Sequence, residues 1–409
     1  MEQTGFDFGS DGLTLFFGAL AVLACFYTLL SVLSLRRLFP KPDPAAAPRV
    51  TPSVTILKPL YGAEEGLYEN LLTFCRQNYS GRVQILFGVH EASDPAALVA
   101  RRIVNALRAE RIEGAPVGVT AELIIDSRMH GTNGKVSNLI NLSRRIEGEM
   151  VVLADSDISV TPDYLNRLAA ALEKPGVGAV TTLYRGVPMA GLWSQLCAMG
   201  VDYTFLPNVV TGVALKLAEP CIGATIALRR TTLEAIGGFQ ALKDQLADDF
   251  VLGAEVRATG QQVVLADFAV GHAHGETRFE ALWRQEMRWA RTVRGLDPLG
   301  YAGTAVTYPF AWAVLAMLTS GFSAPGVMLV FAALACRLIL QDEVDRRFPG
   351  HAHALPLAPL RDLLGFAVYV GSFLPGKLSW RGADFTLARN GAMQPLDLAE
   401  ETAPAEAAG

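Results

Sequence analysis

A short apolar run that ends in two aspartates, from Val151 to Asp157, constrains the fold of this chain more than any other segment. A β-branched run without polar alternation is typical of a strand buried on both faces of a sheet. Asp155 and Asp157 then follow at the edge of that sheet. Hard carboxylate oxygens in such a position suit Mg²⁺ or Mn²⁺, so the run predicts a metal-binding sheet edge.

The stretch from residue 53 to 296 alternates short β-rich runs with helical runs. We expect strands at residues 54–57, 83–89, 117–125, 150–154 and 177–182. We expect helices at residues 65–77, 95–110, 135–146 and 162–172, with Pro162 in a first turn. This alternation predicts an α/β domain with a mostly parallel, Rossmann-like sheet, whose ligand crevice lies at the carboxyl ends of its strands.

The first 40 residues predict a membrane anchor. Leu13 to Leu35 carries no charged residue and is long enough to cross a bilayer. The residues before this run are acidic, whereas Arg36 and Arg37 follow it. By the positive-inside rule, we expect the chain after Arg36 to begin in the cytoplasm. The hydrophobic content of 51% and the positive mean hydropathy agree with a membrane protein.

Two further apolar regions follow the α/β stretch. Residues 302–341, broken by a turn at 320–326, predict a transmembrane helical hairpin with Arg337 as an isolated charge. Within residues 355–387, the run 363–374 is shorter than a spanning helix needs. It either spans with borrowed flanks or re-enters the membrane, and we favour re-entry. Residues 397–409, rich in Ala, Glu and Pro, predict a disordered tail.

Charge and cysteine content exclude some classes of protein. The net charge is −5 and the Lys and Arg residues are dispersed, so we expect no nucleic-acid partner. The five cysteines are scattered without a C-x-x-C pair. This pattern is typical of reduced thiols in a protein that faces the cytosol.

Several polar motifs follow one another along the chain. They are Lys58-Pro59-Leu60, Asp94-Pro95, Asn133-Gly134-Lys135, Asp155-Ser156-Asp157, Ala247-Asp248-Asp249-Phe250 and Gln285-Glu286-Met287-Arg288-Trp289. Each motif is weak alone. Their order within a membrane frame resembles the ceramide glucosyltransferase family of inverting, family-2-like glycosyltransferases with a GT-A fold. It is also similar to the glycosyltransferases of hopanoid biosynthesis. The resemblance runs from Leu13 to about Leu387 and includes Leu378-Ser379-Trp380-Arg381-Gly382.

The resemblance implies a role for each motif. Asp249 would be the catalytic base, and Asp157 and Asp155 would bind Mg²⁺ or Mn²⁺. Substrate contacts would come from Lys58, Asp94, Lys135, Asp155, Gln285, Arg288 and Trp289. Asp248 stands where the family commonly has Glu, and residues 192–217 match the animal enzymes poorly, which leaves the acceptor lipid open.

The chemistry of these residue types agrees with such roles. Direct displacement at an anomeric carbon needs a base on one face, and one positioned base commonly contributes ~10²–10⁴ in rate. A divalent cation together with an arginine stabilises the leaving diphosphate on the other face. Two adjacent carboxylates suit the base because like charges raise the pKa of one of them.

The implied reaction transfers a sugar, with glucose favoured, from a UDP-sugar to the hydroxyl of a membrane lipid, with ceramide favoured. The alternatives are N-acetylglucosamine transfer to a hopanoid polyol, or another lipid or polysaccharide synthase. The partners would be the UDP-sugar donor, the lipid acceptor and the bilayer. We expect a multi-pass protein of the inner (cytoplasmic) membrane with a cytoplasmic catalytic domain.

Plainer readings of the same residues stay open. Asp248 could cap a helix. Arg288 and Trp289, on a helix expected at residues 278–294, could lie on a membrane surface. Lys135 could be solvated or could meet a phosphate at a helix start. Four histidines show no metal-ligand spacing with other ligands, and we interpret them as structural or acceptor-side, namely His90, His130, His272 and His274.

Overall fold

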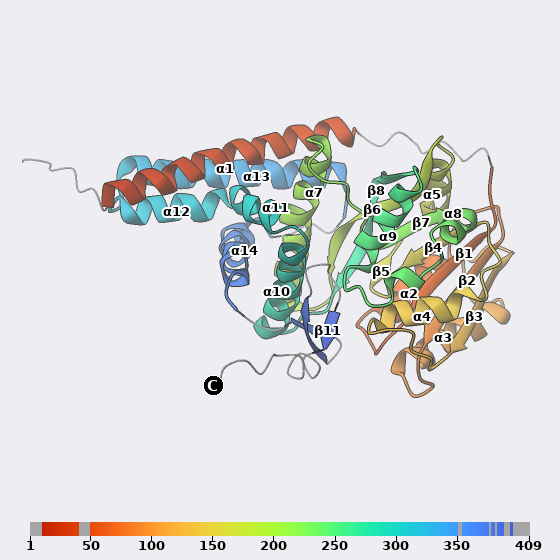
Figure 1. The fold of residues 1–409 in the computed structure, drawn as a ribbon. Helices are drawn as coiled ribbons and strands as arrows, with labels where there is room; N and C mark the ends of the chain where they lie inside the picture. Colours follow the sequence, from red (N-terminus) through yellow and green to blue (C-terminus); the bar gives the residue numbers. More distant parts are fainter. Residues whose placement is uncertain are drawn as a thin grey trace, which may run out of the picture. The chain divides into compact units, whose positions relative to one another are not determined.

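A computed structural model describes residues 10–40, 50–350, 354–375, 378–380, 383–387 and 393–395 (Figure 1). Contacts group the chain into two compact units. The helical unit comprises residues 1–41, 191–218 and 276–378. The sheet unit comprises residues 42–190, 219–275 and 379–409. The predicted tail at 397–409 lies outside the described residues, as do Arg381 and Gly382.

The sheet unit is built on one eight-stranded sheet with the order β3-β2-β1-β4-β7-β6-β8-β5. Neighbours among the first four strands are parallel. Strand β7 is antiparallel to β4 and β6, β8 is parallel to β6, and β5 is antiparallel to β8. The strands are β1 (Val54–Pro59), β2 (Val83–Val89), β3 (Val119–Ile125), β4 (Met150–Ala154), β5 (Ile158–Ser159), β6 (Val177–Pro188), β7 (Thr225–Arg229) and β8 (Gln262–His274). The predicted α/β class with a mostly parallel sheet is confirmed.

Short helices connect these strands, and local caps set where they begin. Asp94 accepts a hydrogen bond from the backbone N–H of Ala96 at the start of α3, and Asn133 does the same for Val136 at the start of α4. The helix at the predicted Pro162 start begins two residues later, at Tyr164. The helices are α2 (Leu67–Cys75), α3 (Pro95–Arg108), α4 (Gly134–Ser143), α5 (Tyr164–Leu172), α8 (Arg230–Ala235) and α9 (Asp248–Ala258), with a 3₁₀ turn at Gln240–Leu242.

The core of the sheet unit explains why the sequence of β4 is apolar throughout. All five of its residues are buried, because helices cover both faces of the central strands. Leu153 belongs to the same apolar cluster as Leu139 of α4 and Leu252 of α9. The cluster therefore holds the starts of α4 and α9 against the sheet edge where β4 ends.

The helical unit contains the apolar segments. Its α-helices are α1 (Ser10–Leu38), α6 (Gly191–Gly200), α7 (Leu206–Ala214), α10 (Phe279–Leu296), α11 (Pro298–Gly303), α12 (Pro309–Thr319), α13 (Ala324–Arg347) and α14 (Ala358–Ser372). A π-helical turn at Val201–Phe205 joins α6 to α7, and 3₁₀ turns occupy Thr304–Thr307 and Leu355–Leu357. Close packing of Ala21, Ala313 and Ala333 brings α1, α12 and α13 together.

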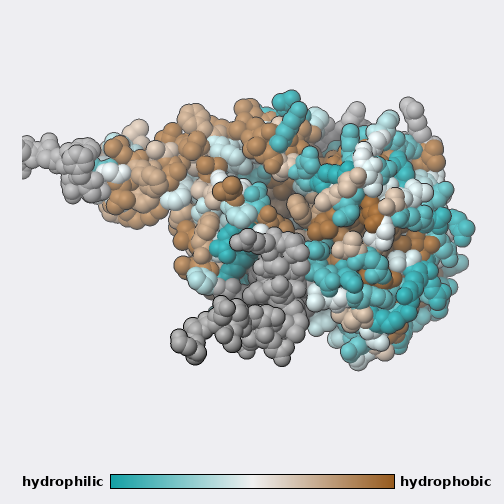
Figure 2. Space-filling model, viewed as in Figure 1, coloured by the Kyte–Doolittle hydropathy of each residue, from teal (hydrophilic) through white to brown (hydrophobic). Residues whose placement is uncertain are grey.

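Within the described residues, two helices are long and apolar enough to cross a membrane, over Asp11–Leu38 and Ala324–Arg347. Figure 2 shows hydrophobic side chains gathered over α1, α12 and α13. Exposed members include Phe16, Phe26 and Phe331, each more than half accessible. Large apolar side chains exposed over a helix bundle indicate a lipid-facing surface.

The predicted hairpin at 302–341 has a different first arm. Instead of one long helix, the segments Pro298–Thr307 and Pro309–Thr319 form a pair bent by 67°. Pro309 cannot donate a backbone hydrogen bond to the preceding turn, so the helix restarts there. The turn after Thr319 leads into α13, whose first turn is capped by Ser323.

Helix α14 covers most of the run 363–374, which we expect to re-enter the membrane. Its 15 residues reach about 22 Å, which is short of the ~30 Å hydrocarbon core. Its first turns carry Arg361 and Asp362, both at most 4% exposed. After α14, three short strands, β9 (Leu378–Trp380), β10 (Ala383–Leu387) and β11 (Met393–Pro395), form a separate small sheet.

Candidate active site

Two aspartates emerge where β4 ends, as the sequence predicts. Strand β4 stops at Ala154, and a turn through Asp155 and Asp157 leads into β5. The Lys135 ammonium lies 2.8 Å from Oδ1 of Asp155. It also lies 3.4 Å from Oδ2 of Asp248 at the start of α9. Lys135 therefore joins the sheet edge to the beginning of α9.

Lys135 is neither solvated nor free in this arrangement, because its side chain is only 13% exposed. Burial alone would lower the pKa of Lys135, but the carboxylates of Asp155 and Asp248 outweigh burial and raise it. The Lys135 ammonium thus lies between two carboxylates that favour its charged form. Its place at the second residue of α4 follows from the Asn133 cap, which starts the helix at Gly134.

Lys58 lies beneath the site. It is fully buried in β1, and its ammonium donates to the backbone carbonyl of Asp155. The same ammonium lies 3.9 Å from the centroid of the Phe74 ring. Burial lowers the pKa of Lys58 to about 7, although Asp155 and Asp157 oppose that shift. Lys58 thus contacts the Asp155 backbone from a fully buried position.

Asp249 is the second residue of α9. Its Oδ2 accepts a hydrogen bond of 2.7 Å from the backbone N–H of Gly223, and its Oδ1 accepts one from Phe250. Burial, followed by repulsion from Asp248, raises the pKa of Asp249 to about 6. The carboxyl is therefore held in one orientation and can exchange a proton near neutral pH. Ala247 is the N-cap residue of α9, so neither aspartate occupies the cap position.

Asp157 has a partner that sequence reasoning missed. Its Oδ2 lies 3.0 Å from Nε2 of His272, at the end of β8. Burial would raise the pKa of Asp157, but His272 and Lys58 lower it to about 2. Oδ1 of Asp157 is buried and has no hydrogen-bond partner among the described residues. An ionised oxygen of this kind is suited to a cation.

A sequence signal for His272 exists, although it is easily overlooked. Residues 262–274 form one long strand, so His272 and His274 lie on the same face of it near its carboxyl end. Both side chains are buried, and their rings contact each other in an edge-to-face arrangement. The sequence signal is therefore a pair of histidines at alternate positions near the end of one long strand.

Asp94 connects two loops at the neighbouring strand ends. Besides capping α3, its carboxylate accepts hydrogen bonds of 3.0 and 3.2 Å from the backbone N–H of Gly62. Gly62 follows β1 and has a φ of +72°, a conformation that favours glycine. Asp94 thus fixes the loop after β1.

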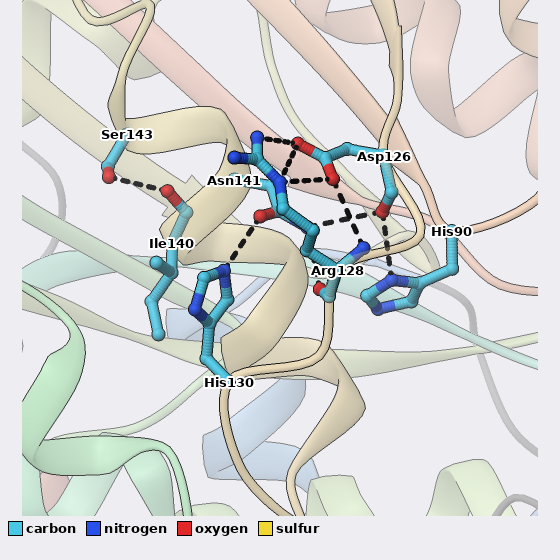
Figure 3. Close-up of polar contacts among 7 residues, drawn as sticks. All are labelled: His90, Asp126, Arg128, His130, Ile140, Asn141 and Ser143. Carbon is cyan, nitrogen blue, oxygen red and sulfur yellow. Dashed lines mark hydrogen bonds and ion pairs between the residues drawn. The ribbon is translucent and has the colours of Figure 1, made fainter.

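The loop between β3 and α4, residues 126–133, is termed the α4 loop; polar contacts hold it to its neighbours (Figure 3). The ring nitrogens of His90 lie 3.1 Å from the Asp126 carbonyl and 2.8 Å from the Gly134 carbonyl. His130 contacts the Asn141 side chain at 2.9 Å, and Asn141 donates to the carbonyls of Asp126 and Arg128. These contacts fix the loop that precedes Lys135.

The remaining predicted site residues lie on α10 of the helical unit. The Arg288 guanidinium donates to Oε1 of Gln285 at 3.1 Å and lies 6.0 Å from the Trp289 ring. Glu286, in the same motif, forms a buried bidentate ion pair with Arg361 of α14. A Cβ atom built on Gly200 or Gly365 would lie 3.0–3.1 Å from that guanidinium. The two glycines therefore leave room for Arg361, a contact that sequence reasoning did not anticipate.

The sheet unit alone assembles much of the predicted site. Lys58, Lys135, Asp155 and Asp248 are connected by direct contacts, and Asp249 is the neighbour of Asp248. This arrangement offers an oriented carboxyl with a pKa near neutrality and a cluster of anionic oxygens. Such a combination can accept a proton and bind a cation.

A family comparison identifies the chain. Residues 16–393 match the family model described as glycosyl transferase family 21. The chain belongs to glycosyl transferase family 21. Among curated relatives of this family 21 chain, ceramide glucosyltransferase 1 of Caenorhabditis elegans is 23% identical over 250 residues, covering 60% of the chain and 48% of the relative. A ceramide glucosyltransferase of Gibberella zeae is 28% identical over 186 residues, covering 42% and 34%. The chain thus spans half or less of the length of these relatives.

A solved structure supports a glycosyltransferase fold for the family 21 chain. A mannosyltransferase from Pyrobaculum calidifontis, solved with GDP-mannose and Mn²⁺, superimposes with a TM-score of 0.50 at 19% sequence identity. The match covers 87% of this chain and 98% of that one. The predicted GT-A glycosyltransferase fold is therefore confirmed.

Proposed function

We propose that the protein is an inverting glycosyltransferase that moves a sugar from a UDP-sugar to the hydroxyl of a membrane lipid, with glucose as the sugar and ceramide as the lipid. The oriented Asp249 carboxyl, with its pKa near 6, is the observation that carries the proposal. Membership of family 21, and the activity named for its ceramide glucosyltransferase relatives, support the substrate classes.

Asp249 is the base in this proposal. Its Oδ2 is held by the Gly223 N–H, and its carboxylate removes the proton of the attacking lipid hydroxyl. Asp248 favours this proton transfer because its negative charge raises the proton affinity of Asp249. Lys135 pairs with Asp248 and not with Asp249, which leaves the Asp249 carboxyl outside the ion pairs of the site.

The residues at the β4 edge fit a divalent cation. Asp157 presents a buried oxygen without a hydrogen-bond partner among the described residues, and Asp155 lies two positions before it. Asp155 and Asp157 would hold Mg²⁺ or Mn²⁺, since both ions prefer carboxylate oxygens. When bound, the cation supplies charge neutralisation for the diphosphate leaving group. The mannosyltransferase of the same fold was solved with Mn²⁺, which agrees with this assignment.

Substrate contacts are assigned to the remaining motif residues. We assign the Lys135 ammonium, which pairs with Asp155, to the diphosphate, and Asp94, which binds the loop after β1, to the nucleoside. On α10, Gln285, Arg288 and Trp289 are assigned to the donor; Gln285 orients the Arg288 guanidinium. Lys58 supports the donor site from below through the Asp155 carbonyl.

Arginines on α1 and α10 support contact between the protein and the bilayer. Arg36 and Arg37 end α1, which supports a cytoplasmic sheet unit in an inner-membrane protein. Arg284, Arg291 and Arg294 give α10 a basic surface, and each such residue near anionic headgroups adds roughly 1 kcal/mol of attraction. The lipid acceptor then stays in the membrane while its hydroxyl reacts.

Purified protein in nanodiscs tests the function. We expect Mn²⁺-dependent release of UDP from UDP-glucose only when ceramide is present, with glucosylceramide identified by mass spectrometry. A parallel set with UDP-N-acetylglucosamine and a hopanoid polyol covers the alternative. Transfer to the polyol and not to ceramide would reject the ceramide assignment, and UDP release without any lipid product would reject lipid transfer.

A further inference from the structure

Two loops of the sheet unit approach each other next to the candidate active site. One is the α4 loop, residues 126–133, which leads to Lys135. The other, residues 243–247, lies between the 3₁₀ turn and α9 and leads to Asp248 and Asp249; it is termed the α9 loop. The Lys135–Asp248 ion pair joins the elements that these loops precede.

The loops are fastened together by four hydrogen bonds. Oδ1 of Asp244 accepts from the backbone N–H of Thr132 at 2.9 Å and from its hydroxyl at 3.3 Å. The Asn133 backbone N–H donates to the Lys243 carbonyl at 2.8 Å, and its side-chain amide donates to the Gln245 carbonyl at 2.7 Å. These contacts, termed the loop clamp, connect chain segments more than 100 residues apart in sequence.

The loop clamp depends on the side chain of Asn133 and on the absence of one at Gly131. Asn133 is fully buried, and its Oδ1 also caps α4 while its amide reaches the α9 loop, so one side chain serves both loops. A Cβ atom on Gly131 would lie 2.6 Å from the Lys243 carbonyl oxygen and 2.5 Å from the Asp244 carboxylate. Backbone thus meets backbone at Gly131, and no larger residue fits without moving the loops apart.

We propose that Asp244 is a positioning residue, which acts through the loop clamp to hold the base Asp249 at a fixed place relative to the donor-binding residues Lys135 and Asp155. The inference rests on the proposed function. When a diphosphate takes the Lys135 ammonium, Asp248 loses its ion-pair partner. The clamp then remains to keep the start of α9 in place.

The proposal predicts separate effects on catalysis and donor binding. Removing the Asp244 carboxylate leaves Asp155, Asp157 and Lys135 intact, so donor affinity should hardly change. Displacement of a base by about 1 Å can lower the rate of the chemical step by about 100-fold. We therefore expect Asp244→Ala to lower kcat by about 10- to 100-fold, with the Kd for the UDP-sugar within two-fold of wild type.

Asp244→Asn is the matched control, because its side chain keeps the oxygen that accepts both Thr132 hydrogen bonds. We expect Asp244→Asn to retain kcat within about three-fold of wild type. Gly131→Ala leaves every polar group in place but separates the loops, so it should lower kcat as Asp244→Ala does. Normal kcat in Asp244→Ala or Gly131→Ala, or equal losses in Asp244→Ala and Asp244→Asn, would overturn the proposal. A proportional loss of donor binding would also overturn it.

Hydrogen exchange on the full-length protein tests the loop clamp independently of sugar transfer. The amides of Thr132 and Asn133 should exchange faster in Asp244→Ala than in wild type, and at the wild-type rate in Asp244→Asn. Unchanged exchange in Asp244→Ala overturns the clamp whatever the activity. If wild-type protein transfers no sugar, the proposed function fails, and faster exchange in Asp244→Ala alone still supports the clamp.

Discussion

Arg337 of α13 and Asp362 of α14 form a bidentate ion pair in which the Nε and Nη2 atoms lie 2.8–3.0 Å from the carboxylate oxygens, and both side chains are at most 4% exposed. The charge that appears isolated in the sequence of the second apolar segment is therefore compensated. Asp362 follows Arg361, whose own ion pair reaches Glu286 of α10. Adjacent residues of α14 thus connect α13 to α10.

Breaking the Arg337–Asp362 pair should destabilise the helical unit. Arg337→Met leaves the Asp362 carboxylate buried without its partner, at a cost of about 3–5 kcal/mol. We expect a lower Tm in detergent for Arg337→Met, whereas the double variant Arg337→Met with Asp362→Leu should recover most of the loss. A double variant no more stable than the single one would show that the pair is not the source of the effect.

Asp249→Asn should abolish sugar transfer and leave UDP-sugar binding nearly intact. The amide cannot accept the proton of the lipid hydroxyl; it keeps an oxygen for the Gly223 N–H but no longer accepts from the Phe250 N–H. Single-turnover assays and calorimetric binding measure the two properties. Asp267→Asn, at a side chain that is 76% exposed, is the control. Transfer within a few-fold of wild type in Asp249→Asn would assign the base elsewhere.

Activity should depend on pH through Asp249. Its pKa is raised to about 6, so the ionised base is lost as pH falls below 6 and kcat should fall about tenfold per pH unit there. Ionisation of Asp249, which activity requires, lowers the stability of the folded state. The folded state disfavours the ionised form, by at most about 3 kcal/mol, fully so above pH 6 and not below the unfolded pKa. The change in Tm caused by Asp249→Asn should therefore be more favourable at pH 8 than at pH 3.5, where no ionisation cost is relieved.

Asp157→Ala should remove the effect of Mn²⁺ on nucleotide binding. The substitution deletes the buried oxygen that lacks a hydrogen-bond partner among the described residues. Titration of UDP with and without Mn²⁺ measures the effect, and Asp267→Ala serves as the surface control. If the Mn²⁺ effect persists in Asp157→Ala, the ligand role moves to Asp155.

Cysteine labelling tests the membrane topology. In a variant without the five native cysteines, Ser323→Cys lies in the turn before α13 and Arg346→Cys lies in its last turn. We expect an impermeant reagent to label Ser323→Cys in intact cells and Arg346→Cys only after permeabilisation. The reverse pattern would place the sheet unit on the outer side of the membrane.

Sequence patterns predict the helices and strands whose ends are set by neighbouring residues. The apolar run of β4, the Asp94-Pro95 start of α3 and the Asn133 cap of α4 can all be read from neighbouring residues. Strands β7 and β8 are less evident, because β7 is short and β8 mixes polar and apolar residues without clear alternation. Fold class thus follows from a few strong segments, and the sheet order does not.

The contacts of the candidate site depend on pairs that are distant in sequence. His272 meets Asp157 across 115 residues, and Asp244 meets Thr132 across 112. No periodicity or spacing encodes such pairs. The sequence indicates which carboxylates are available, but the tertiary structure decides which of them is paired with a cation and which is left to accept a proton.

The buried ammonium of Lys58 limits the stability of the sheet unit. Burial lowers the pKa of Lys58 to about 7, so folding disfavours its charged form, and at neutral pH about half of the folded molecules carry an uncharged Lys58. An apolar side chain at this position would make the sheet unit more robust while releasing the Asp155 backbone. The stability of the sheet unit and the support of the Asp155 backbone therefore oppose each other at Lys58.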